Sequence, residues 1–301
     1  MSNSSKDTLL GRLSNGETLV FDGGTGTYLQ KNGLEPGGCP ELMNIEHPSI
    51  IGDMASAYFD SGSDIVLTNT FGGNKFRLKH YGLENQLLEL NEKAASIAKK
   101  RAPSRCYVAG SIGPTGEFIE PLGSVSEKEM YDAFTDQITA IEQGGADAVM
   151  IETQMAIEEA QIAIKAAREN TNLLVMSTMV FDKGPRGFFS MMGITPEDAV
   201  KGIFEAGAHV AGANCGNGIE KMLEIAAKMR DTTDGFLVIQ SNAGIPSIKK
   251  NQIIYPETPE YMSDFYLKML KLPINILGGC CGTGPEHIKY LRKTLDTFKS
   301  K

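Results

Sequence analysis

Short apolar runs alternate with longer amphipathic segments in this chain, and the pair repeats eight times from residue 19 to the end. The apolar runs are rich in Val, Ile, Leu and Ala, as is typical of strands buried on both faces of a parallel sheet. We expect strands at residues 19–23, 64–70, 107–110, 148–153, 173–179, 209–215, 236–242 and 274–279. We expect helices at residues 49–61, 85–99, 127–142, 157–169, 196–206, 219–229, 258–269 and 285–297. Eight such pairs predict an α/β fold, a single (β/α)8 or TIM barrel.

The rest of the pattern favours one domain over residues 1–301, with residues 1–15 as an N-terminal extension. No internal repeat, low-complexity segment or Pro/Ser linker interrupts the chain. Thr195-Pro196 and Thr258-Pro259 place a capping hydroxyl before a proline at the first helical position, which marks two helix starts. A doubly wound open sheet is the alternative, and it needs fewer strands than we count.

Charge and hydropathy narrow the classes of partner. The formal net charge is −8, and no basic run is longer than Lys99-Lys100-Arg101, which argues against nucleic acid or an anionic membrane as partner. No stretch approaches the roughly 18 apolar residues of a membrane span. We therefore expect a cytoplasmic protein whose partners are small molecules or other proteins.

Five cysteines are too sparse for a disulfide scaffold, so their positions carry the information. Cys215, Cys280 and Cys281 come where the sixth and eighth expected strands end, and parallel strand ends meet at one mouth of a barrel. Three thiolates around zinc leave one coordination position for a substrate, so we predict a catalytic zinc site. Cys39 and Cys106 are interpreted as buried or incidental cysteines.

Adjacent side chains of a regular strand point to opposite faces, which disfavours Cys280 and Cys281 as ligands of one ion. The flanking glycines, Gly278, Gly279 and Gly282, permit a sharp turn that brings both sulfurs together. A strained vicinal disulfide or a pair of buried thiols are the alternatives. His287 is a candidate for an extra zinc ligand, but it is expected within the last helix, where an exposed position or a capping contact is the favoured interpretation.

Polar side chains end the other expected strands as well, notably Asp22, Thr70, Glu152 and Asn242. The segment from Asp22 to Thr27 fits neither nucleotide-binding glycine motif, so a nucleotide site is not expected. Asp22 and Glu152 are interpreted as a counter-charge for an ammonium group, or else as acceptors of backbone bonds at the barrel rim. With a zinc site, the first reading predicts a zwitterionic amino acid that carries a thiol.

Five motifs closely resemble the homocysteine S-methyltransferase family over about Leu19 to Arg292. They are Asp22-Gly23-Gly24-Thr25-Gly26-Thr27, Leu67-Thr68-Asn69-Thr70-Phe71-Gly72, Gly113-Pro114-Thr115-Gly116-Glu117, Gly212-Ala213-Asn214-Cys215 and Gly278-Gly279-Cys280-Cys281-Gly282-Thr283. Within the family, the chain looks most like the homocysteine-binding barrel of cobalamin-dependent methionine synthase. The resemblance implies a zinc-dependent methyltransferase that methylates the thiol of homocysteine to form methionine.

The resemblance also implies a role for each matching residue. Cys215, Cys280 and Cys281 would hold zinc and so activate the substrate thiol. Asp22 and Glu152 would bind the amino group of homocysteine, while Thr70 and the backbone of Gly23 and Gly24 would meet its carboxylate; Asn242 is also counted as substrate-binding. Two departures from the family pattern affect nearby loops: no proline follows Cys215, and Gln240-Ser241-Asn242 replaces Glu-Pro-Asn.

The methyl donor is the least determined part of the prediction. No folate, corrinoid or activation domain follows the barrel in the sequence, so we expect a separate methyl-corrinoid (cobalamin) protein as donor. Apolar residues between Phe181 and Ile194, namely Phe188, Phe189, Met191 and Met192, are interpreted as its docking surface or as a lid. The alternatives are a small donor (S-methylmethionine, S-adenosylmethionine or a betaine) or a non-catalytic zinc- and thiol-binding module.

Overall fold

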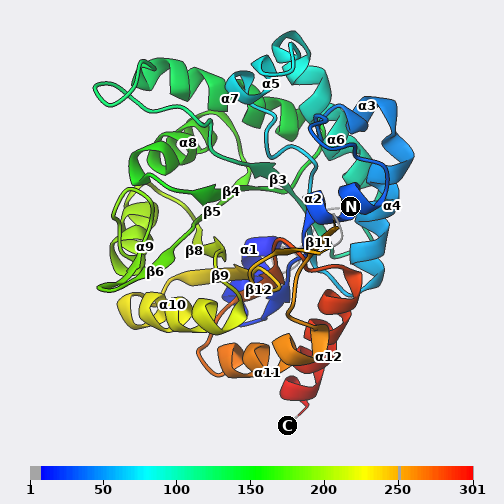
Figure 1. The fold of residues 1–301 in the computed structure, drawn as a ribbon, viewed down its shortest axis with the longest axis vertical. Helices are drawn as coiled ribbons and strands as arrows, with labels where there is room; N and C mark the ends of the chain where they lie inside the picture. The colour runs from blue at the N-terminus through cyan, green and yellow to red at the C-terminus, as the bar shows by residue number, and fades with distance from the viewer. Residues whose placement is uncertain (1–7, 250–251, 301) are drawn as a thin grey trace.

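The computed structural model describes residues 8–249 and 252–300, and its main sheet is a parallel barrel of eight strands (Figure 1). The strand order is β1-β12-β9-β8-β5-β4-β3-β2, and an isolated bridge between Phe21 and Ile65 joins the two edge strands. The strands are β1 (Leu19–Val20), β2 (Ile65–Leu67), β3 (Tyr107–Ile112), β4 (Ala148–Gln154), β5 (Leu174–Met179), β8 (Val210–Cys215), β9 (Phe236–Ser241) and β12 (Ile276–Gly279). The predicted (β/α)8 fold is confirmed.

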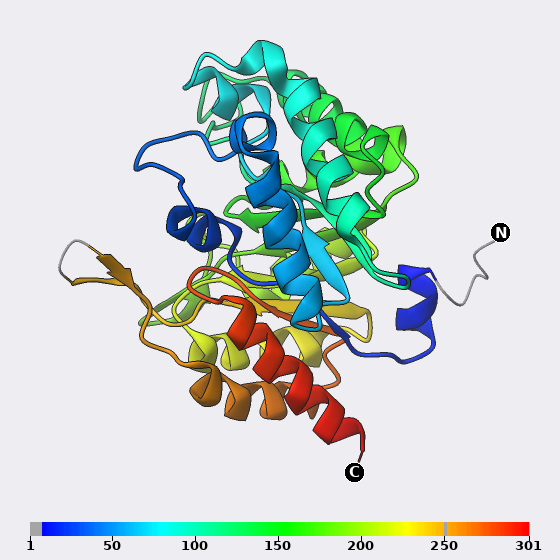
Figure 2. The same ribbon diagram turned by 90° about the vertical axis from the view of Figure 1, so that its right-hand side faces the viewer.

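Helices surround the barrel in the order that the sequence pattern predicts (Figures 1 and 2). The long ones are α4 (Pro48–Asp60), α6 (Leu87–Arg101), α7 (Glu127–Gln143), α8 (Ile157–Asn170), α9 (Pro196–Glu205), α10 (Ile219–Thr232), α11 (Pro259–Leu270) and α12 (Pro285–Lys299). The side chains of Thr195 and Thr258 accept hydrogen bonds from Asp198 N and Tyr261 N, as expected of N-caps. Short elements that the alternation did not predict are α1 (Leu9–Ser14), α2 (Thr25–Lys31), α3 (Met43–Glu46), α5 (Lys75–Lys79) and η2 (Glu84–Gln86).

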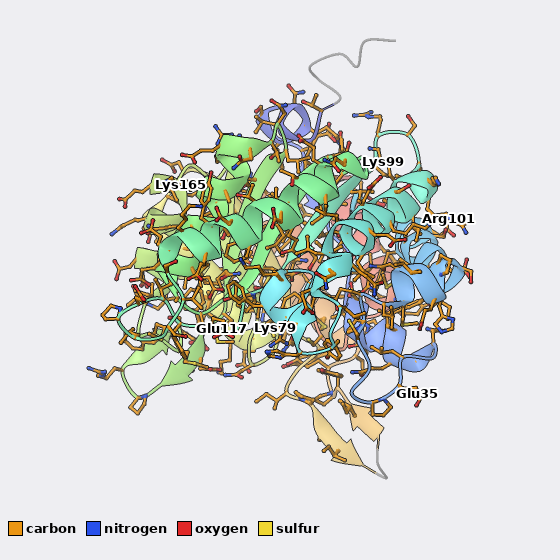
Figure 3. All side chains as sticks on the ribbon, turned by 90° about the horizontal axis from the view of Figure 1, so that it is seen from above. Glu35, Lys79, Lys99, Arg101, Glu117 and Lys165 are labelled. Atoms are coloured by element: carbon orange, nitrogen blue, oxygen red, sulfur yellow. The ribbon has the colours of Figure 1, made fainter. Side chains whose placement is uncertain are left out.

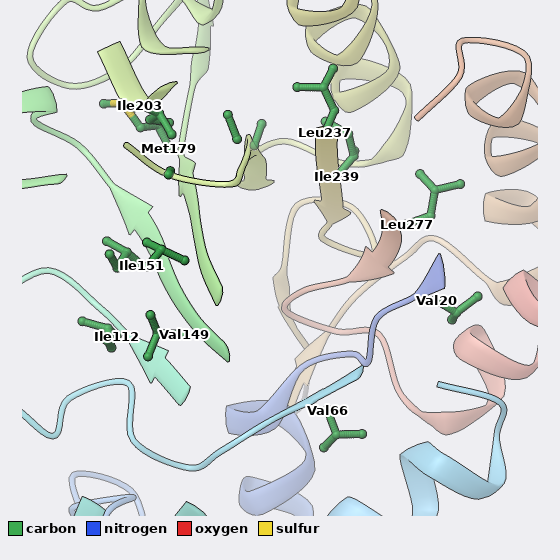
Figure 4. Packing of buried hydrophobic residues seen from close by; sticks show 14 of the residues in the cluster. Val20, Val66, Ile112, Val149, Ile151, Met179, Ile203, Leu237, Ile239 and Leu277 are labelled. Atoms are coloured by element: carbon green, nitrogen blue, oxygen red, sulfur yellow. The ribbon is translucent and has the colours of Figure 1, made fainter. Parts of the chain in front are cut away.

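Two apolar layers hold the barrel together, one on each face of the sheet. Residues such as Val66, Val149 and Leu237 face outward and pack against the helices (Figure 4). Their strand neighbours, such as Ile65, Met150 and Val238, fill the barrel interior. This division follows from the strand geometry, because successive side chains point to opposite faces.

The interior face becomes polar toward the carboxyl end of five of the strands. In β4, the interior positions Ala148 and Met150 are followed two residues later by Glu152. The same step of two leads to Ser111 in β3, Thr178 in β5, Asn214 in β8 and Gln240 in β9, all of them buried. The carboxyl end of the barrel is therefore lined with buried polar groups, where barrel enzymes have their active sites.

The opposite end of the barrel is closed by α1, within the segment that we expected to be an N-terminal extension. Leu9 and Leu13 of this helix are buried and pack with the interior layer. Arg12 forms an ion pair with Asp64, which also pairs with Arg292 of α12. The helix from Leu9 is thus part of the folded barrel rather than an appendage.

Two hairpins project from the loops at the carboxyl ends of the strands. One is β6 (Asp182–Gly184) with β7 (Gly187–Phe189), and the other is β10 (Ser247–Lys249) with β11 (Gln252–Ile254). The second extends well beyond the barrel in Figures 2 and 3. Among the helices of the described ranges, none combines the length and apolar character needed to cross a membrane.

Candidate active site at the carboxyl ends of the strands

The sulfurs of Cys215, Cys280 and Cys281 converge, and all three lie within 4.8 Å of one another. Cys215 ends β8, while Cys280 and Cys281 follow β12, and β9 lies between these two strands in the sheet. The chain just after β9 is bonded to both cysteine segments: Asn242 N donates to Cys215 O, and Ala243 N donates to Cys281 O. The sheet therefore holds the three thiols together although they are distant in sequence.

Glycines near the cysteine pair have two separate functions. Gly282 has a φ of +84°, which is the left-handed conformation that a turn requires. Gly278 and Gly279 lie within β12, and a Cβ there would approach Phe21 Cβ to 2.6 Å and Thr283 Oγ1 to 2.1 Å respectively. Our expectation that all three glycines permit the turn is corrected in this respect, because two of them permit close packing instead.

The three thiols share their protons unequally. The thiols of Cys280 and Cys281 donate to the sulfur of Cys215, which lowers the pKa of Cys215 to about 3. The contact with Cys215 raises the pKa of Cys280 and that of Cys281, the latter to about 11. These contacts favour the thiolate form of Cys215, with Cys280 and Cys281 as the thiols that donate to it.

Polar groups also surround the sulfurs. Asn242 Nδ2 lies 3.4 Å from Cys215 Sγ, and Asn214 Nδ2 lies 3.8 Å from Cys280 Sγ. The hydroxyl of Tyr255, which precedes α11, hydrogen-bonds to the sulfur of Cys281. Donors to sulfur of this kind stabilise thiolates, so the surroundings suit a negatively charged cluster.

Asp22 and Glu152 form the second feature of the site, two buried carboxyl groups. Asp22 Oδ2 accepts a bond from Leu67 N at 2.7 Å, while its buried Oδ1 has no partner among the described residues. Burial and the nearby Glu152 raise the pKa of Asp22 well above its usual 3.8. Burial raises the pKa of Glu152 to about 7. Two carboxyl groups that disfavour each other's charge form a suitable site for a cation.

Asn214 connects the carboxyl groups with the thiols, a role that the sequence reasoning missed. Its Nδ2 lies 3.4 Å from Glu152 Oε2 and 2.8 Å from Thr153 Oγ1, and its Oδ1 accepts bonds from Thr153 N and Thr178 Oγ1. Thr153 has a φ of +59°, a conformation that β-branched residues rarely adopt. The motif Asn214-Cys215 at a strand end was the available signal, but the bonds of Asn214 depend on strands distant in sequence.

Ser111 is a second missed residue, and its Oγ lies 2.5 Å from Glu152 Oε1. Ser111 occupies an interior position of β3, and its register partner in β4 is Met150, the interior residue that precedes Glu152 by two positions. It fixes one oxygen of that carboxyl group. Counting interior positions along the strand could have identified it.

The three residues predicted to meet the substrate carboxylate, and the predicted substrate-binding residue Asn242, are largely engaged within the protein. Gly24 N donates to Thr283 O, and the hydroxyl of Thr70 donates to Ser111 O at 2.7 Å. Gly23 packs so closely against Thr283 that a Cβ would lie 2.6 Å from its carbonyl oxygen. Asn242 Nδ2 is bonded to Gly216 O, and its buried Oδ1 has no partner among residues 8–249 and 252–300. These four assignments stay predictions.

Other residues singled out in the sequence lie away from the thiol cluster. His287 Nδ1 accepts a bond from Gly284 N at the start of α12, the capping contact that we considered. Cys39 Sγ lies 3.3 Å from Glu41 Oε2, and Cys106 Sγ lies 3.7 Å from Ser63 O. Between Phe181 and Ile194, Phe188 is buried while Met191 and Met192 are exposed. Phe188 is therefore not available as a docking surface.

Comparison with known proteins identifies a matching family and similar sequences. A family model described as homocysteine S-methyltransferase matches residues 19–295. The methionine synthase of Mycobacterium leprae (strain TN) is 28% identical over 288 residues, which cover 90% of this chain and 24% of that protein. The methionine synthase of Mycobacterium tuberculosis (strain ATCC 25618 / H37Rv) is 28% identical over 298 residues, which cover 93% of this chain and 25% of that protein. The chain spans about a quarter of the length of these curated relatives.

Solved structures share the same fold. The homocysteine methyltransferase MmuM from Escherichia coli, in its metallated form, aligns with a TM-score of 0.79 and 20% identity over 95% of this chain and 99% of that chain. A methyltransferase from Methanosarcina mazei aligns with a TM-score of 0.63 and 14% identity over 97% of this chain and 99% of that chain. At these identities, the two structures support the barrel fold.

Proposed function

Because this chain belongs to the homocysteine S-methyltransferase family, we propose that it transfers a methyl group to the thiol of homocysteine and so forms methionine. The observation that carries the proposal is the position of three convergent thiols beside two buried carboxyl groups at one end of the barrel. In this proposal, residues 1–301 form a single homocysteine-binding domain. The substrate is held at both ends, with its thiol at the cysteines and its amino group at the carboxyl groups.

Cys215, Cys280 and Cys281 fit a zinc ion by their chemistry and their spacing. Sulfurs bound to one tetrahedral zinc at about 2.3 Å lie roughly 3.8 Å apart, which is compatible with the observed limit of 4.8 Å. A zinc ion held by these residues would leave one position for the substrate thiol and would supply the charge that lowers the pKa of that thiol below its free value of about 8.5. We therefore propose zinc as the cofactor and these three residues as its ligands.

Asp22 and Glu152 bind the ammonium group of homocysteine in this proposal. The unpartnered Asp22 Oδ1 is an acceptor for an ammonium N–H, and a positive charge relieves the repulsion between the two buried carboxylates. Ser111 and Asn214 hold the carboxyl group of Glu152 from two sides. The amino group thereby fixes the substrate in one orientation relative to the cysteines.

The carboxylate of homocysteine is assigned to Gly23, Gly24 and Thr70. For Gly24 and Thr70 this requires exchange of their present bonds to Thr283 O and Ser111 O. The unpartnered Oδ1 of Asn242 adds an acceptor beside Cys215, which supports the assignment of Asn242 as a substrate-binding residue.

The methyl donor in this proposal is a separate methyl-corrinoid protein, as the sequence resemblance to cobalamin-dependent methionine synthase implies. The homocysteine thiol loses its proton to solvent, and its sulfur forms a bond to the methyl carbon. The bond between that carbon and the donor breaks, and its electron pair stays on the donor. Met191 and Met192, exposed by 71% and 39%, remain the candidates for a docking contact or a lid in the segment between Phe181 and Ile194.

An anaerobic assay with separate donors tests this proposal. The zinc-loaded protein is incubated with homocysteine and free methylcobalamin, S-methylmethionine, S-adenosylmethionine or glycine betaine, and methionine is measured by mass spectrometry. The proposal predicts methionine from methylcobalamin alone. Methionine from a small donor instead would replace the corrinoid part of the proposal. Tight homocysteine binding without turnover on any of these donors would leave two alternatives, an obligatory protein donor or a non-catalytic binding module.

A further inference from the structure

A cavity of about 720 Å³ lies outside the thiol site, between the loop that follows β3 and the start of α8. Its volume is within the range of small-molecule sites in proteins. The walls are mainly apolar, and none of the proposed zinc ligands or substrate-binding residues lines it. The apolar lining is Pro114, Phe118, Ile119, Pro121, Leu122, Met155, Ala156, Ile162, Met191 and Met192.

The charges in this cavity are almost all negative. Five carboxyl groups line it, from Glu117, Glu120, Glu127, Glu158 and Glu159, against the single ammonium group of Lys165. Glu117 and Lys165 are labelled in Figure 3. An anionic ligand would meet repulsion here, so the occupant that the charge selects is a cation.

Glu159 is the charged group that is built into the wall of the cavity. It is only 6% exposed, and its Oε1 accepts bonds from both Thr115 N and Thr115 Oγ1 at 2.7 Å. Through these bonds, Glu159 Oε1 holds the loop that follows β3 at Thr115. They leave Oε2 unused, since no residue in the described ranges donates to it. Burial also raises the pKa of Glu159, a cost that a bound cation would offset.

Other cavity residues suit a cation that carries an apolar body. Phe118 is half-exposed and offers an aromatic face, to which cations are attracted. Leu122 and Met191 are more than 70% exposed although they are apolar, so a ligand in the cavity could cover surface that now contacts water. An organic cation fits better than a strongly hydrated metal ion, because the surface beside the carboxyl groups is apolar and would contact the body of such a ligand.

We propose that this cavity is a second binding site, for a small organic cation with an apolar body. The cation contacts Glu159 Oε2 and the face of Phe118, and its apolar body lies against Leu122, Ile162 and Met191. The site does not depend on the proposed methyl transfer. It places a ligand beside β3 and β4, the strands that carry Ser111 and Glu152 to the thiol site.

Calorimetric titration with three matched probes tests the site on the intact chain. 4-Phenylbutylamine, 4-phenylbutanol and 4-phenylbutyrate share one apolar body and differ in charge. We expect the amine to bind at least tenfold more tightly than the alcohol or the acid. Equal affinity for all three, or no binding of the amine at millimolar concentration, would overturn the proposal.

Variants locate the binding and separate it from the thiol site. Glu159→Gln keeps an acceptor for Thr115 and removes the charge, so the amine should lose about tenfold in affinity while the alcohol is unaffected. Phe118→Ala should weaken binding as well, without disturbing the buried Glu159. Glu205→Gln, on the exposed face of α9, is the matched control. Amine affinity that is unchanged in both cavity variants, or lost in Cys215→Ser, would place the amine elsewhere and contradict the proposal.

Discussion

Each end of the barrel has a buried aspartate, and the two carboxyl groups differ in how they are satisfied. At the amino end, Asp64 accepts bonds from Arg12, Arg292 and Val20 N, so its charge is paired and its oxygens are used. At the carboxyl end, Asp22 Oδ1 and Asn242 Oδ1 are buried without a partner in the described residues. A buried group without a partner destabilises the fold, and a ligand at the thiol site would supply the partner that these two atoms lack. The comparison suggests that the amino end provides stability and the carboxyl end provides the site.

The largest predicted effect is on activity at the carboxyl end. Cys215→Ser removes one of three proposed zinc ligands and should lower methionine formation roughly a thousandfold, because metal activation is worth several kcal/mol. Zinc content per chain, measured by atomic emission, should fall with it. Cys106→Ser is the matched control and should retain both methionine formation and zinc content. Full zinc content and turnover in Cys215→Ser would refute the assignment of that ligand.

The next effect contrasts one aspartate at each end. Asp64→Asn leaves the buried Arg12 with a weaker partner and should lower the free energy of unfolding by about 3 kcal/mol. Asp22→Asn removes a charge that is poorly placed in the fold, so the free energy of unfolding should stay the same or rise. Urea denaturation measures both.

The same Asp22→Asn variant should bind homocysteine about tenfold or more weakly, because it loses a charged contact to the ammonium group. Asp53→Asn, on the surface of α4, serves as a control for loss of an aspartate. If Asp22→Asn destabilised the chain as much as Asp64→Asn, the contrast between the two ends would be wrong.

A smaller effect follows from the pKa of Glu152, which burial raises from 4.5 to about 7. A carboxyl group with a raised pKa in the folded state contributes stability that is full below about 4.5 and is lost as the pH rises through about 7. Relative to Glu152→Gln, the wild type should therefore lose on the order of 2 kcal/mol between pH 5 and pH 8. Urea denaturation with a chelator at both pH values measures the free energy of unfolding of the two proteins. The same change with pH in the wild type and in Glu152→Gln would contradict the prediction.

Much of this arrangement could be predicted from local sequence signals. The strands and long helices follow from the spacing of apolar residues, and strand ends in a barrel necessarily meet at one mouth. That rule placed Cys215 near Cys280 and Cys281, as the structure has them. Strand parity alone also leads from Met150 to Glu152 on the interior face.

Features that depend on long-range contacts could not be predicted in this way. The short α1 has a weak sequence pattern, and its burial depends on the open end of a barrel formed far along the chain. The left-handed conformation of Thr153 is accompanied by a bond from its N–H to Asn214 of β8. Phe188 appeared exposed from its place in a loop, yet the fold buries it. In each case the decisive partner comes from another strand or helix.

X-ray absorption at the zinc edge tests the central claim most directly. The zinc-loaded chain should give three sulfur ligands at about 2.3 Å, and a fourth should appear on addition of homocysteine. Homoserine, which has oxygen in place of the sulfur, should leave the count at three. A spectrum without sulfur ligands, or one that homocysteine does not change, would contradict the account of the carboxyl end as a thiol-binding zinc site.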